Sequence, residues 1–274
     1  MKRSYLFVPG NRSERFAKAI ASGAGAVILD LEDAVPPEGK SAAREAVCHW
    51  LSDNARDRTG IAWVRVNSTD TEFFAEDVHA LAGVPLCGLM LPKAESAAQL
   101  RSVADVFGTT ATPIIALVES AVGIWNALEI AQSPQVERLA FGSVDFQLDS
   151  GIQDEDQGLL FARSQLVMAS RIARLEAPID GVTVQIGDAA QLARDVARAR
   201  ALGFGAKLCI HPNQVAGVEQ GFAPSSEEVS WARAVVGAFE KAAGSAARLE
   251  GKLIDLPVVE RARRLLADVK SDAE

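Results

Sequence analysis

The sequence predicts an α/β fold, specifically a (β/α)8 barrel, and two observations carry this prediction. Short apolar runs alternate with longer segments of helical period, and eight such units follow one another along the 274 residues. The runs are almost continuously apolar, which is typical of parallel strands covered by helices. Eight units in about 250 residues match the size of this barrel. A doubly wound open sheet is the alternative, but no GxGxxG follows the first run, which disfavours a dinucleotide-binding form.

The eight predicted strands are runs of apolar and β-branched residues. They are Tyr5–Pro9, Ala26–Glu32, Ile61–Asn67, Gly88–Lys93, Pro113–Glu119, Arg138–Gly142, Gly181–Gln185 and Ala206–His211.

The segments between the strands place apolar residues at spacings of three and four, which indicates amphipathic helices. In the second of them, Ala43, Val47 and Leu51 fall on one face. The predicted helices are Ser13–Ser22, Lys40–Asn54, Phe73–Leu81, Ser96–Phe107, Gly123–Gln132, Leu159–Leu175, Ala189–Leu202 and Glu227–Ala243.

The C-terminal segment lies outside the eight units. Leu249–Pro257 is predicted to be extended or looped, and Val258–Val269 is predicted to form a closing helix. We therefore predict a barrel domain over residues 1–244 and a helical extension over residues 245–274.

The composition indicates a folded protein that does not bind nucleic acid. Hydrophobic residues make up 49% and charged residues 23% of the chain, which is enough for a large core and argues against disorder. The 28 Lys and Arg residues are outnumbered by 36 Asp and Glu residues, and the net charge of −8 repels a phosphate backbone. This balance does not exclude small anionic substrates held by one or two arginines.

Cysteine usage and hydropathy predict a cytoplasmic protein with no membrane segment. Cys48, Cys87 and Cys209 lie far apart and form no CxxC motif, so we expect reduced, buried thiols. The first apolar run stops at Pro9, too short for a signal sequence, whose apolar region needs about 7–15 residues. The longest later run carries Glu119 and falls short of the ~18 residues of a membrane helix.

Polar side chains gather at the C-terminal ends of the predicted strands, where barrel enzymes carry their active sites. In otherwise buried strands, such residues are costly unless they are paired or bind a ligand. They therefore form the candidate site. The set is Asp30, Glu32, Asp33, Arg65, Asn67, Lys93, Glu119, Asp145 and His211.

Glu119 and Asp145 follow consecutive predicted strands and are candidate ligands of a divalent cation. Two carboxylates without a neighbouring cysteine suit a hard ion such as Mg²⁺, which keeps positions for water and substrate oxygens. The structural alternative is that Glu119 pairs with Arg65 or Lys93 and that Asp145 caps a short turn.

The basic residues of the set have two interpretations each. Arg65 can offer a planar fork to a substrate carboxylate or to a developing enolate oxygen, and it can also bridge Glu32 or Asp33. Lys93 would need a lowered pKa to form a Schiff base, whereas nearby carboxylates favour its charged, ion-paired form. For His211 we favour a hydrogen bond at the barrel rim over a role as general base.

Short motifs occur in a fixed order from one end of the chain to the other. They are SYLFVPGN (4–11), LDLEDAVP (29–36), Lys40, Ala43-Arg44, VRVN (64–67), LPK (91–93), VES (118–120), FG (141–142) with Asp145, CIHPNQ (209–214) and GKLIDLP (251–257). Together they resemble the citrate lyase β-subunit-like branch of the HpcH/HpaI aldolase family, and the resemblance covers essentially the whole chain.

The resemblance implies a TIM barrel with a C-terminal lid that assembles as a homotrimer or hexamer. It also implies Mg²⁺-dependent cleavage or formation of a C–C bond next to a thioester, with citryl, malyl or citramalyl groups on CoA or on an acyl carrier protein (ACP). The partner product would be oxaloacetate, glyoxylate or pyruvate. A citrate lyase β subunit would also need α and γ subunits.

The resemblance also assigns roles to individual residues. Glu119 and Asp145 would hold the metal, and Arg65 would bind the carboxylate or carbonyl of the substrate, with Glu119 and Gly142 as further substrate-binding residues. Three charged residues, Glu32, Asp33 and Lys93, would complete the catalytic set.

A C-terminal aspartate is the last residue to which the resemblance gives a role. In malyl-CoA and citramalyl-CoA lyases, the aspartate of an Ile-Asp-x-Pro motif reaches an active site, often that of a neighbouring subunit. Asp255 stands at this place, although an aspartate two residues before Pro257 is also a suitable helix start.

One departure separates the chain from the wider family. Pyruvate-using aldolases carry a histidine after the Asp-x-Glu of the second strand, whereas this chain has Asp33 there. Segment Gln153–Gly158 matches no motif.

The predicted reaction removes a proton from the substrate hydroxyl and generates a thioester enolate. Arg65 and the metal would offset its negative charge, and Asp255 would supply or accept the proton. Two alternatives remain open: a metal-dependent 4-hydroxy-2-oxo acid aldolase that uses free pyruvate, and a citrate lyase subunit that is inactive without its partners.

Overall fold

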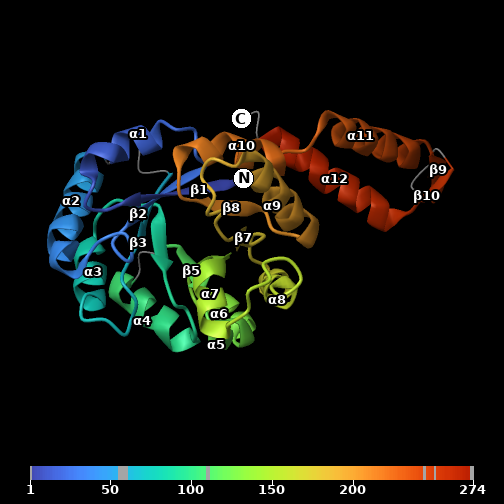
Figure 1. Ribbon diagram of the computed structural model, residues 1–274. Helices are drawn as coiled ribbons and strands as arrows, with labels where there is room; N and C mark the ends of the chain where they lie inside the picture. The colour runs from blue at the N-terminus through green and yellow to red at the C-terminus, as the bar shows by residue number, and fades with distance from the viewer. Residues whose placement is uncertain (1, 55–60, 109–111, 243–244, 250, 272–274) are drawn as a thin grey trace. The chain divides into compact units, whose positions relative to one another are not determined.

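Residues Lys2–Glu219 form a closed barrel of eight parallel strands in the computed structural model, which describes residues 2–54, 61–108, 112–242, 245–249 and 251–271 (Figure 1). Each strand pairs with the next, and β8 pairs with β1 to close the ring. The strands are β1 (Ser4–Pro9), β2 (Ala26–Asp30), β3 (Ala62–Arg65), β4 (Gly88–Leu91), β5 (Ile114–Val118), β6 (Val136–Phe141), β7 (Ile179–Asp180) and β8 (Ala206–Cys209). The predicted (β/α)8 barrel is confirmed, and the closed ring excludes an open sheet.

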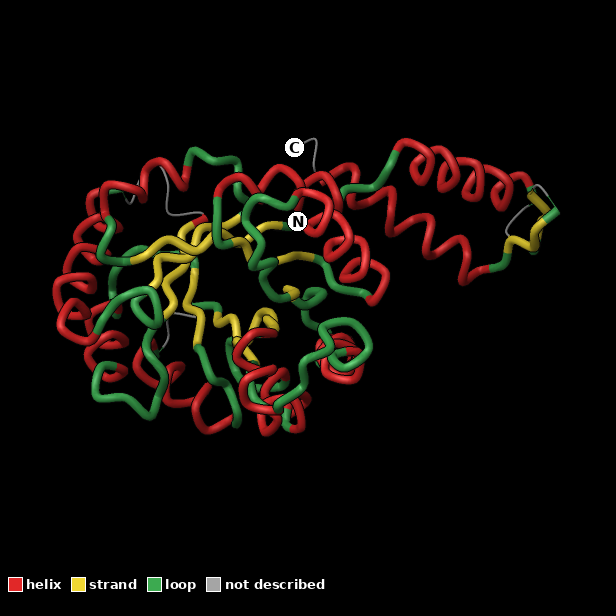
Figure 2. The backbone as a smooth tube through the Cα atoms, viewed as in Figure 1, coloured by secondary structure: helices red, strands yellow, loops and turns green. Residues whose placement is uncertain are grey.

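Helices surround the strands, as the red and yellow parts of the tube in Figure 2 show. Local signals set several of their ends: Ser96 and Gln99 form a capping box before one helix, and Asp188 accepts the N–H of Gln191 at another. The helices are α1 (Phe16–Ile20), α2 (Lys40–Asp53), α3 (Phe74–Leu81), α4 (Ala97–Phe107), α5 (Ala121–Trp125), α6 (Ala127–Ala131), α7 (Ser143–Ser150), α8 (Leu160–Ile172), α9 (Ala189–Leu202) and α10 (Pro212–Phe222), with 3₁₀ turns η1 (Ser13–Arg15) and η2 (Pro37–Gly39).

Apolar side chains fill the inside of the barrel, so it is a packed core rather than a channel. Tyr5, Ile28, Met90 and Leu117 are among the members of this cluster, each at most 2% exposed. The Trp63 indole occupies the space where a Cβ at Gly88 would lie. Because the core is filled in this way, polar groups collect at the ends of the strands.

The structure corrects one predicted strand. The strand placed at Gly181–Gln185 lies earlier, as the two-residue β7 (Ile179–Asp180). The backbone beyond β7 bonds to side chains instead of to a neighbouring strand, since Gln214 Nε2 donates to Thr183 O over 2.7 Å. Thr183 Oγ1 in turn donates to Asp195 over 2.6 Å.

Three helical features also differ from the prediction. The helix predicted at Gly123–Gln132 is divided into α5 and α6 at Asn126, whose side chain donates to Glu95 O over 2.8 Å. Helices α7 and α10 follow β6 and β8 directly and were not predicted. Both lie next to candidate site residues.

The residues from Gln220 onward form a separate compact unit. It contains α11 (Ser226–Lys241), a hairpin of β9 (Ala247–Leu249) and β10 (Lys252–Ile254), and α12 (Leu256–Ser271). Buried Val235, Ile254 and Val259 are part of its own core. Helix α11 therefore groups with the C-terminal unit, whereas we predicted it within a barrel domain over 1–244.

The predicted segments of this unit are mostly present. The closing helix predicted over Val258–Val269 lies within α12, and the extended stretch predicted before it contains β10. Residue 243, the predicted end of the preceding helix, lies outside the described residues.

The structure also bears on the predictions about membrane segments and cysteines. No helix among the described residues is long and apolar enough to cross a membrane. The three cysteines lie among the described residues and form no disulfide there, with Cys209 buried and the other two half-buried.

Candidate active site and metal centre

The C-terminal ends of β2 to β6 bring most of the predicted site residues to one end of the barrel. Asp30 ends β2 and stands opposite Arg65, which ends β3, in the parallel register. Glu32 follows β2, Lys93 follows β4 and Glu119 follows β5 directly. Because the carboxyl ends of parallel strands open at the same rim, these side chains meet there.

Three carboxylates hold Arg65. Its Nε lies 2.7 Å from Asp30 Oδ1 and its Nη2 lies 2.6 Å from Asp30 Oδ2, a bidentate fork. Its Nη1 lies 2.8 Å from Glu32 Oε2 and 3.6 Å from Asp33 Oδ2, as one of our two interpretations expected. The guanidinium also lies 4.8 Å from the centroid of the Phe7 ring.

Arg65 is thus a fixed, permanent positive charge. Burial alone would lower its pKa, but the charge of Asp30 and the hydrogen bonds to it, followed by the charge of Glu32, raise that pKa. Its three short contacts use three of the five N–H donors of a guanidinium, so two can be offered to a ligand.

Lys93 forms the ion pair with Glu32 that its surroundings predict. The distance from Nζ to Glu32 Oε1 is 2.8 Å. Burial tends to lower the pKa of Lys93, but the hydrogen bond to Glu32 and the charge of Glu32 outweigh it and raise that pKa. This disfavours a Schiff base, which requires a lysine with a lowered pKa.

The backbone of Lys93 contributes to the site as well. Its φ of 49° lies in the left-handed region, which is uncommon for a residue with a side chain. In this conformation its N–H donates to Glu119 Oε1 over 2.7 Å.

Glu119 is the most perturbed carboxyl of the site. It is 4% exposed and lines a cavity of about 70 Å³ together with Arg65, Gly142 and Asp145. Burial raises its pKa to about 8, and the negative charges of Glu32 and Asp145 add to this effect. Among the residues that the structure describes, no basic side chain forms an ion pair with Glu119, which excludes the predicted structural alternative of pairing with Arg65 or Lys93.

Gly142 makes room for that carboxylate. A Cβ at residue 142 would overlap Glu119 Oε2 and Cβ, so only glycine fits here without moving Glu119. Gly142 also precedes α7, whose first turn carries Asp145 and points its free N–H groups toward the same end of the barrel.

Replacing Gly142 with alanine is expected to weaken Mg²⁺ binding at least tenfold, because the new methyl group displaces Glu119. A tenfold loss corresponds to about 1.4 kcal/mol. Calorimetric titration with Mg²⁺ measures it, and Gly187→Ala is the control, since nothing lies within 4 Å of a Cβ at residue 187. Equal affinities in the two variants would contradict the proposed placement of the metal.

Buried charged and polar side chains form hydrogen bonds to the backbone of the loop after β2. Lys40 Nζ donates to the carbonyls of Leu31 and Glu32, over 2.9 and 3.0 Å. Asn67 Nδ2 donates to Leu31 O and to the fully buried Asp77. In the sequence, Lys40 stands out only as part of a motif, and Asp77 does not stand out, because an aspartate on a helix carries no signal of burial.

Asp30 is the functional residue whose role sequence analysis missed. It was noted only as a polar strand end, yet it is the closest partner of Arg65 and also accepts the N–H of Glu32 over 2.9 Å. Its position opposite Arg65 follows from the strand register, which is not visible before the strands are aligned.

A buried arginine forms a hydrogen bond to the backbone of segment Gln153–Gly158. Arg163 is 1% exposed, and its Nη1 donates to Glu155 O over 2.6 Å while its Nε bonds to Asp180 over 3.0 Å. The guanidinium of Arg163 lies 5.6 Å from the centroid of the Phe141 ring, and Phe141 lines the same cavity as Glu119.

His211 forms a hydrogen bond at the barrel rim, as we expected, and the other two histidines lie on helices. His211 Nδ1 accepts the N–H of Asn213 over 3.2 Å at the start of α10. His49 lies on α2 with an exposed side chain, and His79 lies on α3, bonded to the carbonyl of Ala75.

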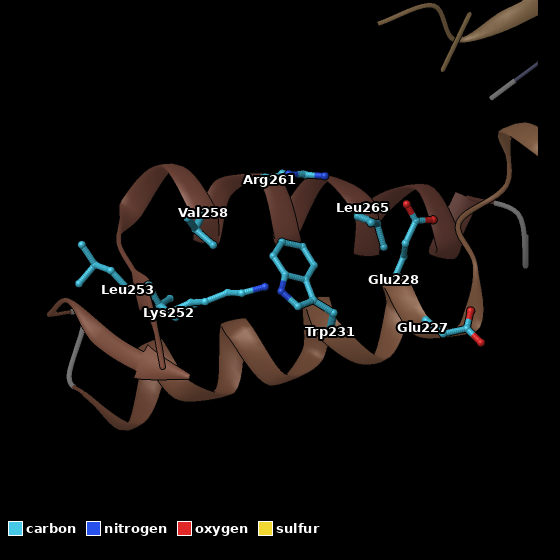
Figure 3. A pocket seen from close by; sticks show the side chains of 9 residues that line it. Glu227, Glu228, Trp231, Lys252, Leu253, Val258, Arg261 and Leu265 are labelled. Atoms are coloured by element: carbon cyan, nitrogen blue, oxygen red, sulfur yellow. The ribbon is translucent and has the colours of Figure 1, made fainter. Parts of the chain in front are cut away.

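Asp255 lies in the C-terminal unit, between β10 and α12. Its Oδ1 accepts the N–H of Val258 over 3.3 Å, so it caps the start of α12 as the alternative interpretation expected. The same unit has a hollow of about 500 Å³, shown in Figure 3, where Arg261 lies 5.5 Å from the Trp231 ring centroid and the Lys252 side chain extends toward Trp231. The hollow contains none of the predicted site residues.

The residues present at the barrel rim fit a divalent cation. Glu119 is buried, lacks an ion-pair partner within the described ranges and is repelled by Asp145, and a cation between the two would reverse that repulsion. In the described part of the chain, no group of three or more His, Cys, Asp or Glu side chains forms a complete cage. Two carboxylates and free positions for water and substrate suit Mg²⁺.

Comparison with known proteins agrees with this geometry. The family model described as HpcH/HpaI aldolase/citrate lyase matches residues 3–212. A citrate lyase subunit beta-like protein of Deinococcus radiodurans is 39% identical over 97% of this chain and 96% of its own length. Human mitochondrial citramalyl-CoA lyase is 32% identical over 96% of this chain and 84% of its own length.

A solved structure is similar over the same extent. CitE of Mycobacterium tuberculosis, crystallised with magnesium, acetoacetate and coenzyme A, has a TM-score of 0.85 and 34% identity, and the match covers 97% of both chains. Fold, rim residues and sequence similarity together show that this chain belongs to the HpcH/HpaI aldolase/citrate lyase family.

Proposed function

We propose that the protein is a Mg²⁺-dependent C–C lyase acting on a 3-hydroxyacyl thioester such as citramalyl-, malyl- or citryl-CoA, or the corresponding acyl-ACP. The observation that carries the proposal is one cavity lined by a fixed guanidinium, Arg65, and by the two carboxylates of Glu119 and Asp145. The human relative is a citramalyl-CoA lyase, and the M. tuberculosis relative was crystallised with magnesium, acetoacetate and coenzyme A. In cleavage, the second product is pyruvate, glyoxylate or oxaloacetate.

The charges of the site assign a task to each residue. Glu119 and Asp145 would hold Mg²⁺, which would polarise the oxygens of the hydroxy acid or oxo acid. The two remaining N–H donors of Arg65 bind the substrate carboxylate or carbonyl and offset the charge of the thioester enolate. Asp30, Glu32 and Asp33 fix the plane of Arg65, Lys93 neutralises Glu32, and Gly142, which lines the cavity where substrate would bind, leaves room for the Glu119 carboxylate.

The proposed cleavage balances as a retro-aldol step. The substrate hydroxyl loses its proton, the C2–C3 bond breaks to give the oxo acid, and the electron pair of that bond becomes the thioester enolate. Protonation of the enolate at C2 releases the acyl thioester. Condensation runs through the same steps in reverse.

Asp255 is proposed as the group that carries these protons, from the C-terminal unit of the same or a second copy. Leu253 and Leu256 lie near it in the sequence and are 63% and 57% exposed. Exposed apolar neighbours fit a segment that is covered during the reaction. The homo-oligomer and a cytoplasmic location belong to the same proposal, whereas citrate lyase α and γ subunits as partners belong to its alternative.

Asp255→Asn is expected to lower kcat about 100-fold or more, in the range of general acid–base catalysis, and to leave KM and the Mg²⁺ affinity unchanged. Asparagine also caps helices, so α12 should stay folded and Tm should change little. The control is Glu260→Gln, an exposed acid of the same helix paired with Arg263. A fall in Tm that accounts for the lost activity would show a structural role only.

The proposed function is tested by incubating the Mg²⁺-loaded protein with citramalyl-, malyl- and citryl-CoA and following the acyl-CoA and oxo-acid products by chromatography. We expect cleavage of at least one, lost with EDTA and lost in Asp145→Asn. Cleavage of free 4-hydroxy-2-oxo acids alone would identify the aldolase instead. Release of free CoA without an oxo acid would indicate hydrolysis, and activity only after addition of α and γ subunits would identify a citrate lyase component.

A further inference from the structure

Three charged side chains are buried together between the last strands of the barrel and the helices around them. They are Arg163 of α8, Asp180 at the end of β7 and Lys207 of β8, each at most 1% exposed. Arg163 Nε lies 3.0 Å from Asp180 Oδ1, and Lys207 Nζ lies 3.6 Å from Asp180 Oδ2. We refer to these three residues as the buried triad, and the proposed reaction uses none of them.

The charge of Lys207 is not explained by packing. Ile179, Ala206 and Leu208 belong to the apolar core inside the barrel. Because side chains alternate along a strand, Asp180 and Lys207 face the surrounding helices, a layer that apolar residues ordinarily fill. Buried ions lose their hydration, and apolar residues of similar size often serve stability as well or better. The ammonium of Lys207 therefore has a task other than filling space.

That task is to hold the backbone where the pairing of β7 ends. Within the described residues, β7 pairs with β8 at Ile179 and Asp180. Lys207 Nζ donates to the carbonyl of the next residue, Gly181, over 2.5 Å. A charged donor forms a stronger hydrogen bond than a neutral one, so this bond fixes the Gly181 carbonyl in place of a ladder bond.

Gly181 is in close contact with the start of α7. A Cβ at residue 181 would overlap both Oγ and Cβ of Ser143, so only glycine allows this approach. Ser143 is 2% exposed and is the first residue of α7, two residues before Asp145. Val182, which follows Gly181, lines the same cavity as Asp145. The position of Gly181 thus determines where α7 begins relative to the cavity.

The buried triad also contacts the chain beyond the other end of α7. Arg163 Nη1 donates to Glu155 O over 2.6 Å. Gln147 of α7 donates to the carbonyls of Ile152 and Gln153, each over 3.3 Å. Helix α7 is therefore connected to the buried triad on both sides.

We propose that Lys207 is a positioning residue of the metal site. Through Gly181 and Ser143, it holds the start of α7 and thereby keeps Asp145 at the cavity. The inference rests on the proposed function, because it takes Asp145 as a ligand of Mg²⁺. Lys207 itself contacts neither metal nor substrate in this role, and Asp180 balances its charge.

Lys207→Met tests the inference, because it removes the bond to Gly181 and keeps an unbranched side chain. At a temperature where the variant is folded, calorimetric titration should give a Mg²⁺ affinity at least tenfold below that of wild type. Hydrogen exchange of the metal-free protein, followed by mass spectrometry, gives a readout without the cation. Residues 143–150 of α7 should exchange several times faster than in wild type.

Arg138→Met is the matched control. Arg138 is also a fully buried cation, and its Nε donates over 2.5 Å to the carbonyl of Ala177, which precedes β7 instead of following it. This variant removes a comparable bond away from α7, so it should leave both the Mg²⁺ affinity and the exchange of α7 unchanged.

A second set of variants leaves the buried triad intact and serves even if Lys207→Met does not fold. Gly181→Ala places a methyl group against Ser143 and should weaken Mg²⁺ binding at least tenfold. Adding Ser143→Gly removes the atoms that this methyl group overlaps and should restore most of the affinity. A general loss of stability would not be reversed in this way.

The outcomes separate the inference from the proposed function. Wild-type Mg²⁺ affinity or wild-type exchange of α7 in Lys207→Met would overturn the inference, and so would a double variant that binds no better than Gly181→Ala. A wild-type chain without affinity for Mg²⁺ would instead contradict the proposed function, and the exchange of α7 would still decide whether Lys207 holds this helix.

Discussion

Replacing Glu119 with glutamine is expected to stabilise the metal-free protein at pH 8 and to abolish its response to Mg²⁺. Burial, with the negative charges of Glu32 and Asp145, raises the pKa of Glu119 to about 8 against a usual value of 4.5. Arg65 is the positive charge that acts on it in the opposite direction, and it does not outweigh the burial.

The sign of the pH effect follows from that raised pKa. A carboxyl of this kind stabilises the fold only while it is protonated, so its contribution is complete below about pH 4.5 and is lost as the pH rises through about 8. The loss is on the order of a few kcal/mol, which for a chain of this size corresponds to roughly 5–10 °C in Tm. Glutamine does not ionise, so the variant should not show this decline.

Thermal unfolding between pH 5 and pH 9, with and without Mg²⁺, measures both effects. Wild-type protein should lose stability with rising pH when metal-free and regain it with Mg²⁺, because only the ionised carboxylate binds the cation. Glu45→Gln, an exposed acid on α2, should behave as wild type. A Glu119→Gln protein that still gains Tm with Mg²⁺ would place the cation elsewhere.

The barrel was predictable because its signal is repeated. Each of the eight apolar runs buries most of its residues, and β2 and β5 bury all of theirs. Because the strand–helix pattern occurs eight times, a wrong boundary in one unit does not change the predicted fold. The short β7 shows the limit. Its two residues are too few to generate a pattern, and the sequence after it alternates like a strand although its backbone bonds to side chains.

The candidate site was predictable in its members but not in its pairing. Charged residues at strand ends identify Arg65, Lys93 and Glu119, because such residues are rare in buried strands. That Arg65 is held mainly by Asp30, or that Glu119 lies against Gly142, depends on strand register and on close backbone approach. Neither quantity is encoded in the spacing of residues along the chain.

Arg65→Lys is expected to lower kcat/KM about 10²- to 10³-fold while the barrel stays folded. Lysine keeps the positive charge but replaces a planar fork by a single ammonium, so it cannot satisfy both oxygens of Asp30 and also reach a substrate. A loss of this size is typical when one fixed donor to a developing oxyanion is removed. Steady-state kinetics with the thioester identified as substrate measure it.

The matched control is Arg44→Lys, because Arg44 is also a buried arginine paired with an aspartate but does not line the cavity. Both arginines are 8% exposed, and both place Nε 2.7 Å from an aspartate, Asp77 in the case of Arg44. The two variants should therefore lose similar stability, whereas only Arg65→Lys should lose most of its activity. If both lost activity in proportion to their fall in Tm, Arg65 would be a structural residue, and the enolate charge would have to be offset by the metal alone.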